Sequence, residues 1–141
     1  MKKEIIDMLL KTDQIRIRQS DTERIKSMIK FAEMNVKIAK SIPLNEDSAT
    51  LVFREIYESL RQLGDSKWWA SGYEPRNHEV SMEILKEMDI KEKVLLNHLT
   101  RFKRIRNDAN YRGFRISVAQ AKDIIDFWNR CAGDILKEIL K

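Results

Sequence analysis

The stretch SDTERIKSMIKFAEMNVKIAKS, residues 20–41, decides the fold class. Apolar side chains recur in it at intervals of three and four, namely Ile25, Met28, Ile29, Ala32, Val36 and Ala39. This spacing places them on one face of an α-helix. Ser20 and Glu23 have the form of a capping box, in which each side chain satisfies a free backbone N–H at a helix start. Pro43 predicts the end of the helix, because proline cannot continue the backbone hydrogen-bond ladder.

The same helical spacing extends through the rest of the chain. Further helices are expected over 4–11, about 45–63, 77–88, 90–111 and 117 to the C-terminus. The predicted caps are Asn45, Asp89 and Ser117, and the predicted left-handed stops are Gly64 and Gly113. QIRIRQ at 14–19 alternates like a strand, but we expect helix or coil there because no partner strand is evident.

Short connections make consecutive helices antiparallel neighbours. We therefore predict an all-α fold, an up-and-down helical bundle of four to five main helices. A single domain is expected over 1–141, with 1–19 as an N-terminal extension that includes a short helix or coil. DSKWWASGYEPR at 65–76 is predicted to be a loop whose aromatic residues pack against the bundle or stack on bases.

Composition narrows the class of protein. Only four Gly and two Pro are present, which argues against turn-rich sandwiches and barrels. Cys131 is the only cysteine, so no internal disulfide forms and a cytoplasmic location is expected. We expect no signal peptide, because the short apolar run near the start is broken by Asp7, and we expect no membrane span. The two histidines and one cysteine do not make a zinc-ligand pattern, so neither a metal nor a cofactor is predicted.

Positive charge is concentrated in RFKRIRNDANYRGFR, residues 101–115. This segment holds six basic residues and one acid, an excess of +5 that equals the net charge of the whole chain. Such a run is commonly a solvated helix face. The near absence of acids instead favours an anion site, because arginine offers a planar donor fork to phosphate oxygens. Spacing of three and four places Arg104, Asn107, Asp108 and Tyr111 on one strip, and Tyr111 can donate to a phosphate or stack on a base.

RIRNDANYRG at 104–113 resembles the signature of the HEPN superfamily, small helical-bundle proteins of prokaryotic toxin–antitoxin pairs and RNA-cutting defence systems. The pattern is an arginine, commonly followed by a polar residue, and then a histidine four to six residues on. Arg106 and Asn107 match its beginning, and Tyr111 stands where the histidine belongs. The run Ala109-Asn110-Tyr111 is similar to the Ala-Asp-Tyr variant of some branches. A weaker similarity is Gly72…Asn77-His78…Ile84-Leu85.

The resemblance implies a homodimer in which two arginine-containing segments face each other, without metal or cofactor. It implies binding of RNA or a nucleotide, and many relatives pair with a small nucleotidyltransferase. The catalytic candidates are Arg106, Asn107 and Tyr111. The candidates for nucleic-acid binding are Arg101, Lys103, Arg104, Asp108, Asn110, Arg112 and Arg115.

Tyrosine in the histidine position changes the expected chemistry. A histidine titrates near neutral pH, whereas an unperturbed tyrosine titrates near pH ~10. We therefore expect the toxin-side member of a toxin–antitoxin pair with weak or absent metal-independent ribonuclease activity. The alternative is a non-catalytic dimeric adaptor for a nucleotidyltransferase, with Tyr111 as a target for nucleotidylation.

Overall fold

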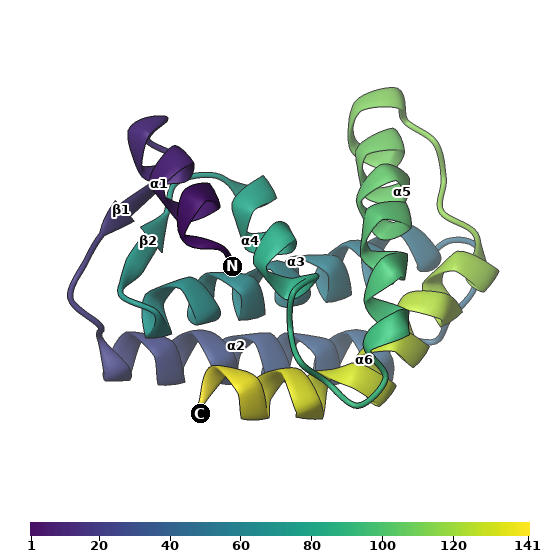
Figure 1. The fold of residues 1–141 in the computed structure, drawn as a ribbon. Helices are drawn as coiled ribbons and strands as arrows, with labels where there is room; N and C mark the ends of the chain where they lie inside the picture. Colours follow the sequence, from purple (N-terminus) through teal and green to yellow (C-terminus); the bar gives the residue numbers. More distant parts are fainter.

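The computed structural model describes the whole chain, residues 1–141, and confirms the predicted all-α helical bundle (Figure 1). The elements in chain order are α1 (Lys3–Lys11), β1 (Ile15–Ile17), α2 (Thr22–Ser41), α3 (Ala49–Ala70), β2 (Tyr73–Pro75), α4 (His78–Leu85), the 3₁₀ helix η1 (Lys93–Asn97), α5 (His98–Arg112) and α6 (Val118–Ile139). No helix combines the length and apolar character needed to cross a membrane.

The long helices α2, α3 and α6 form the body of the molecule (Figure 1). Consecutive helices α2 and α3 run antiparallel, as their short connection requires. Their apolar faces meet in one buried cluster that extends from Ile25 on α2 to Ile139 on α6. This continuous burial, rather than helix propensity, stabilises the long helices.

α5 stands at a steep angle to these helices and projects from the bundle (Figure 1). Its first half is anchored by Leu99 and Phe102, both buried. The Phe102 ring meets the rings of Phe53 and Phe127 edge-on, at centroid distances of 5.9 and 5.5 Å. None of residues 103–115 is fully buried, so the second half of α5 and the turn after it are a ridge on the surface.

Gly64 was predicted to stop a helix, and this prediction is wrong. α3 continues through it to Ala70. A β-carbon at Gly64 would lie 2.0 Å from the backbone oxygen of Ser81, so the glycine is needed for the close approach of α3 and α4. The predicted loop at 65–76 is consequently wrong as well, and both Trp68 and Trp69 are buried on α3.

The prediction of helix or coil at 14–19 is wrong, because β1 forms a small antiparallel sheet with β2. Ile15 lies opposite Pro75, and Ile17 lies opposite Tyr73. Pro75 is tolerated because a two-stranded sheet consists of edges only. Buried Ile15 joins a second cluster, which also contains Leu9, Trp68, Val80 and Ile84, and this cluster attaches the N-terminal segment to the bundle.

The helix ends predicted from the sequence are confirmed only in part. The capping box of Ser117 and Gln120 is present, and Gly113 ends α5 with a left-handed φ of 70°. α2 is capped by Asp21 instead of Ser20, with its carboxylate accepting from the Arg24 N–H at 3.0 Å.

Two other predicted helix starts are wrong. Asn45 closes the turn before α3 by accepting from the N–H groups of Asp47 and Ser48 at 2.9 and 3.0 Å, and the helix begins at Ala49. No α-helix starts directly after Asp89, since the chain first forms the 3₁₀ helix η1 and α5 begins at His98.

Candidate functional site

The basic residues of 101–115 lie along α5 and in the turn that follows it. Four of the six form ion pairs, and their nearest nitrogen–oxygen distances are 3.3 Å for Arg101 with Asp123, 2.6 Å for Lys103 with Glu79, 3.9 Å for Arg112 with Asp108 and 3.1 Å for Arg115 with Asp47. Arg104 and Arg106 have no carboxylate partner. Asp108 belongs to the segment itself, whereas Asp123, Glu79 and Asp47 come from other parts of the chain and compensate three of the five excess positive charges, which the sequence does not reveal.

These ion pairs are all at least partly exposed to solvent. Exposed ion pairs contribute little to stability, typically less than about 1 kcal/mol. Lys103 donates a hydrogen bond to Glu79 and thereby lowers the pKa of that carboxyl group. A phosphate oxygen can replace such a carboxylate at small cost, so the paired cations are still available to an anionic ligand.

Arg106 is held by two contacts within the chain. Its guanidinium carbon lies 5.6 Å from the centre of the Tyr57 ring of α3, and its Nη1 donates to the Asn107 amide oxygen at 3.1 Å. Tyr57 is only 4% exposed. Burial raises the pKa of Tyr57 to about 12, although the positive charge of Arg106 acts in the opposite direction. The neutral ring is thus a rigid support for the guanidinium.

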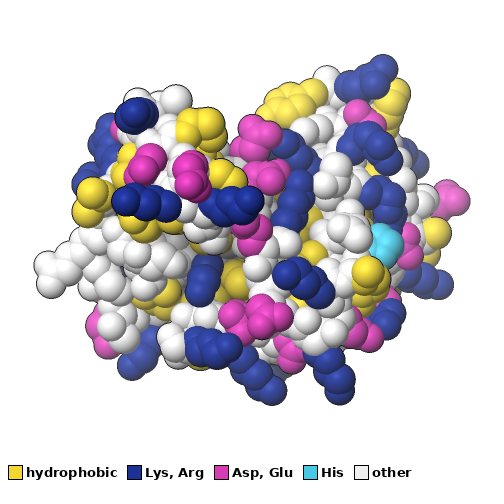
Figure 2. Space-filling view, viewed as in Figure 1, with side chains coloured by type: hydrophobic (Ala, Val, Ile, Leu, Met, Phe, Trp, Pro, Cys, Tyr) yellow, Lys and Arg dark blue, Asp and Glu magenta, His cyan; other side chains and the backbone are white.

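The Arg106–Tyr57 contact lies where α5 meets the bundle. Lys103 and Arg106 reach from α5 towards Glu79 of α4 and Tyr57 of α3, respectively. Figure 2 shows a hollow between the side of the molecule that carries α1 and α4 and the ridge of α5, with basic side chains along the ridge. Tyr57 and Glu79 were not among the predicted site residues, because nothing local in the sequence places them beside α5.

The three catalytic candidates do not converge within one chain. Asn107 is hydrogen-bonded to Arg106, but Tyr111 is 78% exposed and its hydroxyl makes no hydrogen bond within the chain. α5 remains helical to Arg112, so positions 106 and 111 differ by about 140° around its axis. Tyr111 instead lies on the same face of α5 as Arg104 and Asp108. Asn110 is exposed near the end of the helix.

The turn after α5 adds an aromatic residue that the sequence prediction omitted. Phe114 is 54% exposed, directly after the left-handed Gly113. The Arg112 guanidinium carbon lies 4.9 Å from the centre of the Phe114 ring. Two exposed aromatic rings, Tyr111 and Phe114, and two arginines, Arg112 and Arg115, therefore share the end of the ridge.

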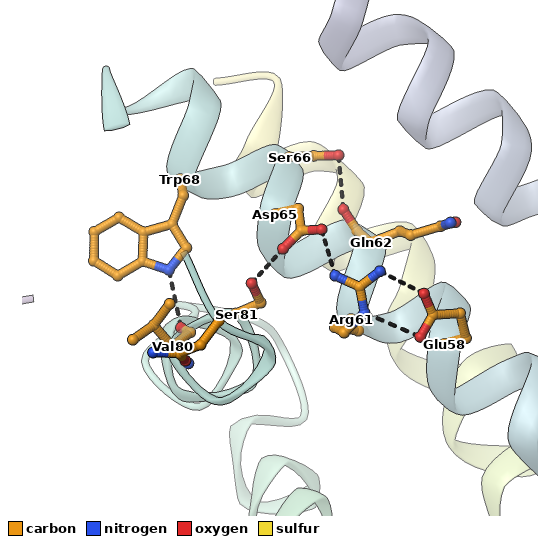
Figure 3. Close-up of polar contacts among 9 residues, drawn as sticks. Glu58, Arg61, Gln62, Asp65, Ser66, Trp68, Val80 and Ser81 are labelled. Carbon is orange, nitrogen blue, oxygen red and sulfur yellow. Dashed lines mark hydrogen bonds and ion pairs between the residues drawn. The ribbon is translucent and has the colours of Figure 1, made fainter. Parts of the chain in front are cut away.

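A partly buried polar cluster of Glu58, Arg61, Asp65 and Ser81 connects α4 to α3 (Figure 3). Arg61 pairs with Glu58 and with Asp65, and the Ser81 hydroxyl donates to the other oxygen of Asp65. Burial raises the pKa of Asp65 despite these partners. Every charge in the cluster is paired, and Ser81 is fully buried. The cluster therefore has a structural role.

The indole N–H of Trp68 adds a second link between the same helices. It donates to the Val80 backbone oxygen of α4 at 2.9 Å (Figure 3). Together with the cluster it sets the position of Glu79 next to α5. The structure contains no group of three or more His, Cys, Asp or Glu side chains with the arrangement of a metal site.

No protein-family model, no curated protein and no solved structure matches this chain.

Proposed function

We propose that this chain is a HEPN-like protein that binds RNA or a nucleotide through α5. In this proposal it is the cytoplasmic, toxin-side member of a toxin–antitoxin pair, with weak or absent ribonuclease activity. The observation that carries the proposal is the projecting ridge of α5, on which Arg104 and Arg106 have no carboxylate partner. The resemblance of residues 104–113 supports the family assignment.

Arginine and lysine side chains on the ridge would bind the phosphate groups. Arg106 is held by the Tyr57 ring and by Asn107, so it loses little conformational freedom when it binds. Arg104 is exposed and offers a second planar donor fork. Arg101, Lys103, Arg112 and Arg115 would exchange their carboxylate partners for phosphate oxygens.

Dimerisation belongs to the same proposal. Within one chain, Arg106 faces α3 while Tyr111 points into solvent. A two-fold pair that brings two ridges together would place the Tyr111 of one copy near the Arg106 of the other. Such a composite site would contain phosphate-binding arginines and a phenol, but no histidine to transfer protons at neutral pH.

The binding proposal is tested by fluorescence anisotropy with a labelled oligoribonucleotide over a range of salt concentrations. Affinity should fall with salt, with a logarithmic slope of about 0.7 for each phosphate contacted. The double variant Arg104→Ala/Arg106→Ala should bind more weakly and show a smaller slope. The matched control is Lys26→Ala/Lys30→Ala, which removes two exposed lysines of α2 that have no ion pair. Equal effects of both double variants would contradict a site on α5.

Ribonuclease activity is measured separately with purified protein, RNA and a chelator. We expect slow cleavage that is lost in Arg106→Ala, or no cleavage. Equal cleavage by the wild-type protein and Arg106→Ala would assign the activity to a contaminant.

The exposure of Tyr111 favours the adaptor as a second candidate function. Its hydroxyl is open to solvent and therefore accessible to a modifying enzyme such as a small nucleotidyltransferase. Mass spectrometry of the protein produced together with the product of its neighbouring gene would show an added nucleotide on Tyr111. An unmodified Tyr111 in the presence of an active nucleotidyltransferase would contradict this alternative.

A further inference from the structure

We infer that the end of α5 is a binding site for unpaired nucleobases, with Tyr111 and Phe114 as the stacking surfaces. This inference rests on the proposed function and names the substrate class: single-stranded RNA in preference to a duplex. Both rings are large, flat and mostly exposed, at 78% and 54%, respectively. Base–aromatic stacking tolerates any sequence, since every base has a flat π face.

The turn between the two rings is short and has a defined shape. Gly113 adopts a left-handed φ of 70°, and its N–H bonds to the Asp108 oxygen, so the rings are separated by two residues of fixed backbone. A β-carbon at Gly113 would meet nothing within 4 Å, which shows that the turn is open on its outer side. A single strand can therefore approach both rings without displacing any part of the bundle.

The arginines at the turn favour an anionic polymer as the ligand, rather than an apolar protein surface. An arginine directly follows each ring, Arg112 after Tyr111 and Arg115 after Phe114. Their partners Asp108 and Asp47 lie at 3.9 and 3.1 Å in exposed pairs, and the Asp47 side chain is 95% exposed. Phosphates can displace these acids, while the bases occupy the adjacent rings.

A recess beside Phe114 provides room for the edge of one base. It has a volume of about 150 Å³, and its lining residues are Ile105, Asp108, Phe114, Arg115, Ile116 and Gln120. The Gln120 amide oxygen accepts from the Ser117 N–H at 3.0 Å, which leaves the amide NH₂ as a donor. The Asp108 carboxylate is an acceptor. Donor and acceptor groups together match the hydrogen-bonding edge of an unstacked base.

Duplex RNA does not fit this arrangement. Its bases are stacked on each other, and its deep, narrow major groove excludes side chains. A duplex would contact only the arginines through its phosphates. The aromatic rings would then add no affinity, so the contribution of the rings distinguishes single strands from duplexes.

The test compares three probes in anisotropy and competition assays: a short labelled oligoribonucleotide, the same strand as a duplex, and inorganic polyphosphate. For Tyr111→Ala/Phe114→Ala we expect single-strand affinity to fall by roughly fivefold or more for each ring lost. Duplex and polyphosphate binding should fall far less, because neither probe has an unpaired base to stack on the rings. Tyr111→Phe/Phe114→Tyr keeps both rings and should retain affinity. The matched control is Phe31→Ala/Ile38→Ala on α2, whose side chains are each 55% exposed.

Several outcomes would overturn the inference. Unchanged single-strand affinity in Tyr111→Ala/Phe114→Ala would show that the rings do not bind bases. An equal loss for polyphosphate would assign the effect to charge or to misfolding, and circular dichroism detects the latter. If the wild-type protein binds none of the three probes, the proposed function itself fails. If the protein binds all three probes and Tyr111→Ala/Phe114→Ala does not weaken any of them, only the proposed base-binding site is contradicted.

Discussion

Gly64 determines how closely α3 and α4 pack. An added β-carbon would collide with the backbone of Ser81, and the fixed backbone of α4 cannot move aside like a flexible side chain. Gly64→Ala should lower the free energy of unfolding by about 1–3 kcal/mol. Gly133→Ala is the control, because its β-carbon would meet nothing within 4 Å on α6 and should gain up to about 1 kcal/mol. Urea unfolding measures both, and equal effects would contradict the close contact.

Tyr57 should make the stability of the protein depend on pH in the alkaline range. In the unfolded chain its phenol loses a proton near pH ~10, whereas in the folded protein its pKa is about 12. The unfolded state therefore binds fewer protons between these values, and the free energy of unfolding falls as pH rises. This group leaves the free energy of unfolding unchanged below about pH 10, lowers it progressively between about pH 10 and 12, and removes roughly 2–3 kcal/mol in total above that range.

Tyr57→Phe isolates this effect, since it keeps the ring beneath Arg106 but removes the ionisable group. Urea unfolding at pH 9 and pH 11 should show a smaller loss of stability in the variant, by about 1 kcal/mol. Other groups titrate equally in both proteins and cancel in the comparison. An identical pH dependence would mean that Tyr57 is not a buried neutral phenol.

α5 combines an anchoring half with a ligand-binding half. Phe102 is fully buried between two aromatic rings, so Phe102→Ala should cost about 3–5 kcal/mol of unfolding free energy. Tyr111→Ala, nine residues on, should change it by less than about 0.5 kcal/mol. Thermal and urea denaturation check the contrast. A large destabilisation by Tyr111→Ala would show that the end of α5 packs on the bundle and is not an open ridge.

The predicted elements were most reliable where local signals agree. Helix α6 follows from its apolar spacing and from the capping box of Ser117, and both causes lie within the helix. Gly64 was misread because its reason is the backbone of α4, which no local pattern shows. Strand β1 was missed because its partner β2 is three residues long and far away in the sequence. The predicted start of α5 was early because residues 93–97 form a tighter 3₁₀ turn.

The candidate site, too, has some features that local sequence shows and others that depend on contacts between distant segments. The basic run on α5 and the exposed tyrosine can be read from the sequence. The support of Arg106 by Tyr57 depends on the fold, and so do the acids outside the segment that pair with three of the basic side chains. The separation of Arg106 from Tyr111 follows from helix spacing alone, and the structure adds that α5 does not unwind before Arg112.

The whole molecule presents two different surfaces on either side of its hollow. One is the ridge of α5, with arginines and exposed aromatic rings. The other is a groove of about 460 Å³ between α1 and α4, whose lining combines Met1, Ile5, Met8, Leu9 and Val80 with Gln14, Glu79, Glu83, Lys86 and Glu87. Glu79 is already paired with Lys103, and the remaining Glu83 and Glu87 outnumber Lys86, so the groove has no excess positive charge to bind phosphate. RNA should therefore contact the ridge and leave the groove unoccupied.

The most direct test is an NMR titration of ¹⁵N-labelled protein with a short single-stranded oligoribonucleotide, followed through the backbone amide signals. The largest chemical-shift changes should fall within residues 101–115, with smaller changes at Tyr57 and Glu79. Changes confined to the α1–α4 groove or to α2, with residues 101–115 unaffected, would contradict the assignment of RNA binding to α5.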